Sequence, residues 1–325
     1  MSRIRSLVWT CACVPGIVLA ACAGDPAPTP PPATSSWRVL APLADGPRQE
    51  NGVAVLNGEI FVVGGFDENG AVVADAEAYN PATNTWRRVA PLPAPLHHPN
   101  VAVARGRIYV VGALTASNFA ATGAVYEYDP LTDTWATRAA MPAGTQRGAA
   151  ATAAIGDRIY IAGGARGAAV NEFSVYDAAA NTWQALPALP TAREHFFAVA
   201  SGTRIITIGG RAGALRAQVE IFDTANNQWT TGTPLPTPRG GHMGAIVNGR
   251  VHVLGGEGNP APGTNGVFAE HEVYDIAANT WSTAERMRTP RHGTQAVTIN
   301  GVLYAIGGAT RQGFGAVAAN EAFAP

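Results

Sequence analysis

The spacing of the tryptophan residues constrains the fold of this chain more than any other feature. Apart from Trp9, every tryptophan falls on one ladder with steps of 49, 49, 48, 46 and 52 residues: Trp37, Trp86, Trp135, Trp183, Trp229 and Trp281. A ladder of paired glycines runs in phase with it and is broken once by alanine: Gly64-Gly65, Gly112-Ala113, Gly163-Gly164, Gly209-Gly210, Gly255-Gly256 and Gly307-Gly308. A third ladder is aromatic: Tyr79, Tyr128, Tyr176, Phe222, Tyr274 and Phe323. Three ladders with one period predict six copies of one structural unit.

The residues of each unit predict four short strands. In the first unit, a small apolar strand at 52–56 leads through Asn57 and Gly58 to a second strand at 60–63. An Asn-Gly pair between two apolar runs is typical of a type I′ hairpin. The third strand carries the aromatic ladder and the fourth carries the tryptophan. Each unit is therefore expected to be a four-stranded antiparallel meander.

One such sheet cannot bury both of its faces, so the units must pack against one another. The double glycine, the spaced aromatic residue and the tryptophan together resemble the kelch repeat over residues 37–325. The resemblance implies an all-β fold, a six-bladed kelch-type β-propeller with four antiparallel strands in each blade. It implies no single function, because such propellers include both enzymes and binding modules.

The two ends of the propeller region predict how the ring closes. The sixth unit stops at Phe323 without a tryptophan strand of its own, and Trp37 is left over at the other end. We expect the segment around Trp37 to supply the fourth strand of the last blade, which leaves no sheet edge unpaired.

The first 21 residues predict a cleaved signal peptide, because basic residues precede an apolar stretch that is too short for a mature membrane helix. The sequence Leu-Ala-Ala-Cys at 19–22 resembles the lipobox of bacterial lipoproteins, which implies lipidation of Cys22. Residues 22–36 are then a proline-rich tether, and 37–325 form the propeller. The alternative is an ordinary signal peptide with a chance cysteine.

We expect the chain to be exported and anchored to the bacterial envelope, touching the membrane only through the lipid. Ala23 is not the aspartate associated with inner-membrane retention in enteric lipoproteins. In a Gram-negative host this favours the outer membrane or the cell surface.

Charge and cysteine content exclude several function classes. The net charge of −1 argues against a nucleic-acid partner. Cys11 and Cys13 lie in the signal peptide and Cys22 would carry the lipid, so the folded domain has no thiol. Disulfides, thiolate metal sites and cysteine nucleophiles are thereby excluded. Kelch propellers that resemble galactose oxidase need a cysteine crosslinked to tyrosine, which excludes copper radical oxidase chemistry.

One face of the predicted propeller is rich in arginine and histidine, because the loop entering the first strand and the loop after the second strand emerge on the same side. An arginine recurs sixteen residues before the double glycine in five units, with Leu96 in that place in the second. This face predicts a ligand surface formed by Arg48, His98, Arg147, Arg193, His195, Arg239, His242, Arg291, His292, Arg211 and Arg311. Guanidinium groups there suit a carboxylate, phosphate or sulfate. The alternative is that the repeated arginines serve the hydrogen bonding of the repeat itself.

We expect no metal site and no cofactor. The rings of His97 and His98 would point to opposite faces of an extended segment, and no carboxylate or cysteine is placed to complete a site with His195, His242 and His292. Four acidic residues two positions before the aromatic ladder predict structural ion pairs between blades: Glu77, Glu220, Glu272 and Glu321. No nucleophile elbow, phosphate loop or dinucleotide motif is present.

The absence of a unique catalytic constellation favours a binding or interaction module of the cell envelope over an enzyme. Its partner at the loop face is expected to be a protein, a peptide or an anionic glycan. The alternative is a carbohydrate-active enzyme of the sialic acid mutarotase (epimerase) type, because exported kelch propellers of that kind resemble this chain in size and in their arginine-rich loop face.

Overall fold

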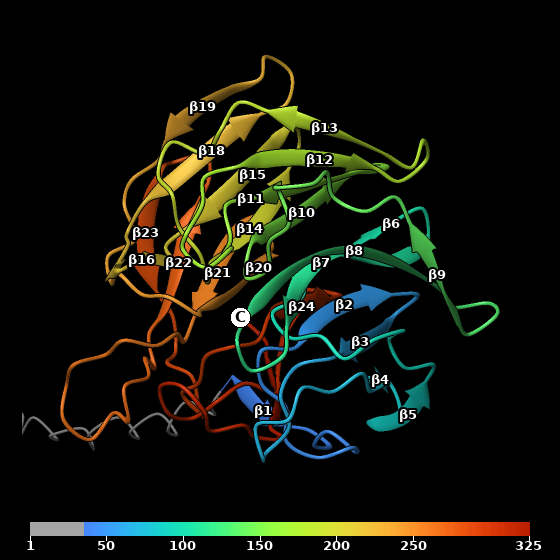
Figure 1. Ribbon diagram of the computed structural model, residues 1–325. Coiled ribbons are helices and arrows are strands. Elements are labelled where there is room, and N and C mark those ends of the chain that lie inside the picture. The colour runs from blue at the N-terminus through green and yellow to red at the C-terminus, as the bar shows by residue number, and fades with distance from the viewer. Residues whose placement is uncertain (1–35) are drawn as a thin grey trace, which may run out of the picture. The chain divides into compact units, whose positions relative to one another are not determined.

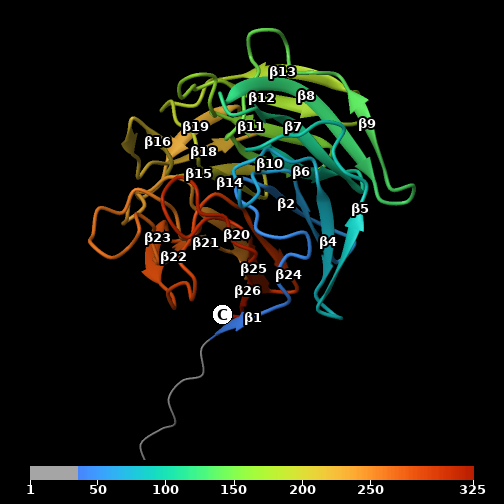
Figure 2. The same cartoon turned by 60° about the horizontal axis from the view of Figure 1, so that its bottom comes forward.

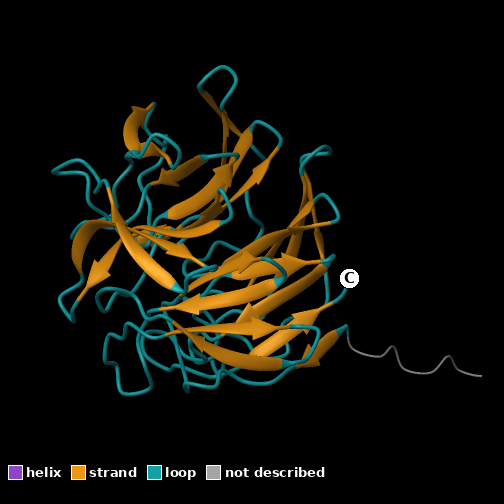
Figure 3. Ribbon diagram, turned by 90° about the vertical axis from the view of Figure 1, so that its right-hand side faces the viewer, coloured by secondary structure: helices purple, strands orange, loops and turns teal. Residues whose placement is uncertain are grey.

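The computed structural model describes residues 36–325, which form six four-stranded antiparallel sheets that follow one another around a ring (Figure 1). The described residues contain strands and loops and no helix (Figure 3), and therefore no helix able to span a membrane. The predicted six-bladed propeller is confirmed. The predicted signal peptide, Cys22 and nearly all of the tether lie outside the described residues.

The first three blades contain the strands β2 (Gly52–Leu56), β3 (Glu59–Val63), β4 (Ala76–Asn80) and β5 (Thr85–Val89); β6 (Val101–Ala104), β7 (Arg107–Thr115), β8 (Ala120–Asp129) and β9 (Thr134–Arg138); and β10 (Ala151–Ile155), β11 (Arg158–Ala162), β12 (Phe173–Asp177) and β13 (Thr182–Leu186). Within each blade the strands pair in chain order, as the predicted meander requires.

The other three blades contain β14 (Phe197–Ser201), β15 (Arg204–Ile208), β18 (Val219–Asp223) and β19 (Gln228–Thr231); β20 (Met243–Val247), β21 (Arg250–Leu254), β22 (His271–Asp275) and β23 (Thr280–Thr283); and β24 (Ala296–Ile299), β25 (Val302–Ile306), β26 (Asn320–Phe323) and β1 (Trp37–Val39). A small hairpin of β16 (Arg211–Ala212) and β17 (Ala214–Leu215) is inserted in the fourth blade.

The ring closes through β1, which pairs antiparallel with β26 so that Trp37 lies opposite Phe323. Figure 2 shows β1 beside β26. The first strands of the blades lie innermost and contact one another in turn, and β24 of the last blade contacts β2 of the first. The sheet edge expected from the missing sixth tryptophan strand is thus paired, and the predicted closure is confirmed.

The hydrophobic core is divided into six clusters, one at each interface between neighbouring blades. Each tryptophan packs on the aromatic ladder residue of its own blade, with ring centroids 5.0–5.3 Å apart. Its indole N–H donates to the carbonyl four residues after the preceding tryptophan, as Trp86 does to Ala41 at 2.9 Å. The tryptophan ladder therefore joins each blade to the blade before it.

The double glycine serves the same interfaces. The N–H of Gly65 donates to the carbonyl of Leu96 in the next blade at 2.8 Å. A Cβ on Gly64, which has a φ of +61°, would lie 2.5 Å from that carbonyl oxygen, so only glycine allows this approach. In four other blades the carbonyl in that place belongs to the repeated arginine.

The second blade departs from the others where alanine replaces the second glycine. Ala113 continues β7 past a bulge, and β7 and β8 pair on to Thr115 and Ala120. The long hairpin extends over the loop face and carries Phe119 at its turn.

Loss of ring closure should cost more stability than any change on an exposed face of the same strand. Trp37 is 3% exposed, so Trp37→Ala should lower the free energy of unfolding by about 3–5 kcal/mol. Val39 on the same strand is 63% exposed, and Val39→Ala should stay within about 0.5 kcal/mol. Urea denaturation measures both, and equal values would contradict closure by this strand.

Candidate functional site

The mouth of the central channel is lined by one residue from each blade, two positions after the repeated arginine. These six residues, here called the channel ring, are Glu50, His98, Ala149, His195, Gly241 and Gly293. All have a left-handed backbone, with φ between 49° and 69°. Each backbone N–H donates to the carbonyl of the preceding ring residue at 2.5–3.1 Å, and Glu50 completes the circle by donating to Gly293.

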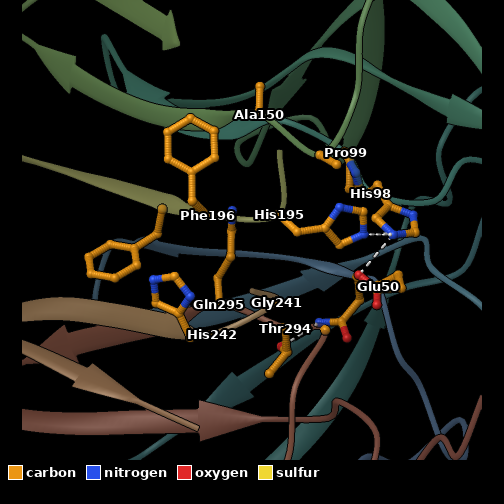
Figure 4. A pocket seen from close by; sticks show the side chains of 14 residues that line it. Glu50, His98, Pro99, Ala150, His195, Phe196, Gly241, His242, Thr294 and Gln295 are labelled. Atoms are coloured by element: carbon orange, nitrogen blue, oxygen red, sulfur yellow. Dashed lines mark hydrogen bonds and ion pairs between the residues drawn. The ribbon is translucent and has the colours of Figure 1, made fainter. Parts of the chain in front are cut away.

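Three members of the channel ring carry functional groups, and these face one another (Figure 4). The Nε2 atom of His98 lies 2.9 Å from Nε2 of His195 and 3.1 Å from Oε2 of Glu50. The three side chains are 4–11% exposed. They line a cavity of about 60 Å³ together with Phe196, His242 and neighbouring residues. A left-handed backbone costs a residue with a Cβ about 1 kcal/mol or more, so these residue types are held there against their local preference.

Burial dominates the electrostatics of this cluster. It raises the pKa of Glu50 and holds the pKa of His98 well below its usual value. Each shift is toward the neutral form of the group, because charge is poorly solvated at these buried positions.

His97 orients His98 from behind. The two Nδ1 atoms lie 2.6 Å apart, and Nε2 of His97 lies 3.0 Å from the carbonyl oxygen of Ala116. The expectation that these rings point to opposite faces was wrong, since the left-handed φ of 49° at His98 breaks the alternation of an extended strand.

Acidic groups and one arginine surround the ring. The guanidinium of Arg211 is paired with both Glu194 and Glu257, and Oε2 of Glu194 lies 3.0 Å from Nδ1 of His195. Burial raises the pKa of Glu194, but His195 and Arg211 outweigh it, and the pKa lies at about 2. Burial also raises the pKa of Glu257, but the nearby His292 and Arg211 lower it more, so the net shift is downward. The positive charge of Arg211 is therefore balanced by the carboxylates of Glu194 and Glu257.

The remaining candidate histidines face carbonyl oxygens. Nε2 of His242 lies 3.0 Å from the Ile208 carbonyl, and Nε2 of His292 lies 3.0 Å from that of Arg311. Nδ1 of His292 lies 3.7 Å from carboxylate oxygens of both Glu50 and Glu257. The expectation that no carboxylate accompanies the histidines was wrong, because Glu50 lies with His98 and His195.

The five repeated arginines lie beneath the loop face, with 0–3% exposure. Arg193, Arg239 and Arg291 pair with the acidic residue two positions before the aromatic ladder. These are the predicted structural ion pairs with Glu220, Glu272 and Glu321, but each joins the entering loop to the third strand of the same blade and not to another blade.

The other two repeated arginines donate hydrogen bonds to backbone carbonyls and a hydroxyl of their own blades. In the third blade Arg147 donates to Ser174 Oγ at 2.8 Å and to the Ile161 carbonyl at 3.0 Å. Burial lowers its pKa to about 10. Arg48 donates to the Gly64 carbonyl at 3.3 Å, while Glu77 accepts from Ala44 N–H at 2.9 Å. Arg311 differs from all five because it is exposed, and its Nε donates to the Phe314 carbonyl.

A groove of about 560 Å³ lies beside the channel ring over the second, third and fourth blades. Its walls are largely small or apolar, including Leu114, Phe119 and Ala169, and Glu194, His195 and Arg211 also line it. Phe119 and Phe314 are 39% and 50% exposed. Both rings pack on Phe66, with centroids 6.0 and 5.1 Å away, and form with it an aromatic patch on the loop face.

Several of these residues are not evident as site residues in the sequence. Phe119 and Phe314 lie in loops of low sequence regularity, although the missing second glycine in the second unit marks the unusual hairpin. Glu50 and Glu194 stand in the entering loops without a motif around them. The signal that points to Glu50 is its register, since its column reads Glu, His, Ala, His, Gly, Gly through the six units.

Comparison with known proteins agrees with the fold. The family described as the KLHDC2/KLHL20/DRC7 Kelch-repeats domain matches residues 148–319, and the Kelch motif matches residues 47–93. The first match covers more than half of the chain. The chain therefore belongs to the kelch-repeat family, as the repeat resemblance implied.

A solved structure described as "Structure of YjhT" superposes with a TM-score of 0.72 at 17% identity, covering 87% of this chain and 96% of that one. This similarity shows a shared fold. No curated protein matches the chain in sequence.

The buried arginines should behave as structural residues. Arg291→Ala leaves Glu321 buried without its partner and should destabilise the fold by about 3–5 kcal/mol. Arg311→Ala, on the exposed loop, should stay within about 0.5 kcal/mol. Urea denaturation of the two variants makes the comparison, and a mild effect at Arg291 would place its charge in solvent.

Proposed function

We propose that this propeller is a binding module that holds a protein segment on its loop face, in the groove beside the channel ring. The observation that carries this proposal is the pair of exposed phenylalanines on the loop face: Phe119 lines the groove, and Phe314 packs on Phe66 beside it. Large aromatic residues at a groove are typical anchors of protein interfaces.

The charge at the channel mouth favours such a partner over an anionic sugar. The repeated arginines are buried, and Arg211 is neutralised by Glu194 and Glu257. A carboxylate or sulfate arriving there would have to displace these protein carboxylates. The apolar walls and aromatic rim are better matched by an extended peptide with apolar side chains.

We further propose that the propeller is displayed on the bacterial envelope, outer membrane or cell surface, by a lipid on Cys22 and the tether at 22–36. This proposal rests on the lipobox resemblance and the proline-rich composition. The loop face would then be free to meet other envelope proteins.

Site-specific photocrosslinking in cells tests both proposals. A photoreactive amino acid replacing Phe119 or Phe314 should give discrete crosslinked proteins in the envelope fraction. Leu131 is 85% exposed in the β8–β9 turn, on the opposite face, and the same replacement there should give none. Each of Phe119→Ala and Phe314→Ala should weaken binding of the captured partner by more than about 1 kcal/mol.

Equal crosslinking at all three positions would contradict the loop-face proposal. In the same cells, Cys22→Ala should release the chain from the membrane fraction, and continued membrane association would contradict the lipid anchor.

A second candidate is an enzyme of the sialic acid mutarotase type. It is favoured by the contact of Glu194 with His195 in the groove, because anomer exchange needs a proton donor and acceptor within reach of the sugar. NMR exchange measurements on N-acetylneuraminic acid should then show acceleration by the wild-type chain and none by His195→Ala. An unaccelerated rate with the wild-type chain removes this candidate.

A further inference from the structure

Three electron-pair donors meet at one point in the channel ring. They are Nε2 of His98, Nε2 of His195 and a carboxylate oxygen of Glu50, and all lie within 4.8 Å of one another. They come from the second, fourth and first blades, so the closed ring and not the local sequence brings them together.

Hydrogen bonds behind His98 determine where its proton lies. The carbonyl of Ala116 can only accept, so the proton of a neutral His97 is on Nε2. His97 Nδ1 then accepts, and His98 must donate from its own Nδ1. This leaves a lone pair on Nε2 of His98, pointing at His195 and Glu50.

A carboxylate has the same effect on His195. Oε2 of Glu194 lies 3.0 Å from Nδ1 of His195, although not in hydrogen-bond geometry, and its negative charge favours a proton on Nδ1 and a lone pair on Nε2. A carboxylate behind a histidine is the usual outer partner of a metal ligand. Lone pairs at 2.9 Å, with a Glu50 oxygen at 3.1 Å, repel one another unless a proton or a metal ion lies among them.

We propose that His98, His195 and Glu50 bind one divalent transition-metal ion of the zinc type. Two imidazole nitrogens and one carboxylate oxygen match the donors that zinc and its neighbours prefer. Calcium and magnesium prefer oxygen ligands, whereas two of the three donors here are imidazole nitrogens. Such a site departs from the expectation of no metal drawn from the sequence. It shares His195 with the groove but does not require peptide binding.

The dimensions of the site fit such an ion. Tetrahedral zinc with bonds of about 2.0–2.1 Å places two nitrogens about 3.3 Å apart, so the two rings need to separate only slightly from 2.9 Å. The cavity of about 60 Å³ beside the ligands has room for a water in the fourth position and none for a sugar or a drug-sized ligand.

The rest of the channel ring makes room for these ligands. A Cβ on Gly293 would overlap the carboxylate of Glu50, and Ala149 and Gly241 add little side-chain bulk to the channel ring. Nδ1 of His292, a residue that is 1% exposed, lies 3.7 Å from the second oxygen of Glu50. This nitrogen has no hydrogen-bond partner among the described residues, so it is available to a water on the ion.

Isothermal titration of the full chain in detergent, after EDTA treatment, tests the proposal with Zn²⁺ alone as the probe. We expect one Zn²⁺ per chain. Glu50→Gln keeps the side-chain shape and should weaken binding at least tenfold, and His195→Ala should weaken it at least a hundredfold. Co²⁺ should bind in the same place and give the absorption of a four- or five-coordinate ion.

A second histidine pair provides the matched control. Nδ1 of His252 lies 2.8 Å from Nε2 of His271 in the fifth blade. Among the described residues this pair is not part of a group of three metal-ligating side chains, so His252→Asn should leave Zn²⁺ affinity unchanged. No stoichiometric binding by the wild-type chain, or equal affinity in Glu50→Gln, would overturn the proposal and leave protons as the charge shared by the cluster.

Discussion

The structure of the channel mouth depends on one set of interactions, the backbone hydrogen bonds that join the six residues of the channel ring. Each N–H reaches the carbonyl of the preceding blade only because its residue adopts a left-handed conformation. The circle is complete only when the sixth blade meets the first, which the pairing of β1 with β26 ensures. This backbone geometry fixes the direction of the side chains at these positions, and those of Glu50, His98 and His195 point toward one another in the channel (Figure 4).

Around this ring the kelch repeat supplies a polar frame that is complete in itself. The second glycine of the pair donates a backbone hydrogen bond to a carbonyl of the next blade. In three blades the repeated arginine forms an ion pair with a glutamate on the third strand of its own blade. Removing one partner of such a buried ion pair is costly, because it leaves the other charge buried and unpaired. Residues that differ among the units, such as Glu50, His98 and Phe119, are therefore the ones free to carry function.

The sequence predicts the blades well because their ladders are local and repeated six times. Closure by Trp37 follows from counting strands, and the arginine column follows from its register. The burial of that column was not predictable from loop position alone, because it depends on partners that the fold supplies. Three of the arginines pair with an acidic residue of the third strand, and the other two bind backbone carbonyls and Ser174. The cluster of Glu50, His98 and His195 was hidden for a different reason. These residues are far apart in the chain, and strand alternation gives the wrong direction for a left-handed residue such as His98.

Closure of the ring brings the three donors of the proposed cation site together from three blades. Anomalous diffraction at the zinc absorption edge, on crystals of the chain grown with Zn²⁺, tests it most directly. One strong peak is expected about 2.0–2.2 Å from Nε2 of His98, Nε2 of His195 and a carboxylate oxygen of Glu50. A channel without a peak, or a peak only on surface residues, would contradict it.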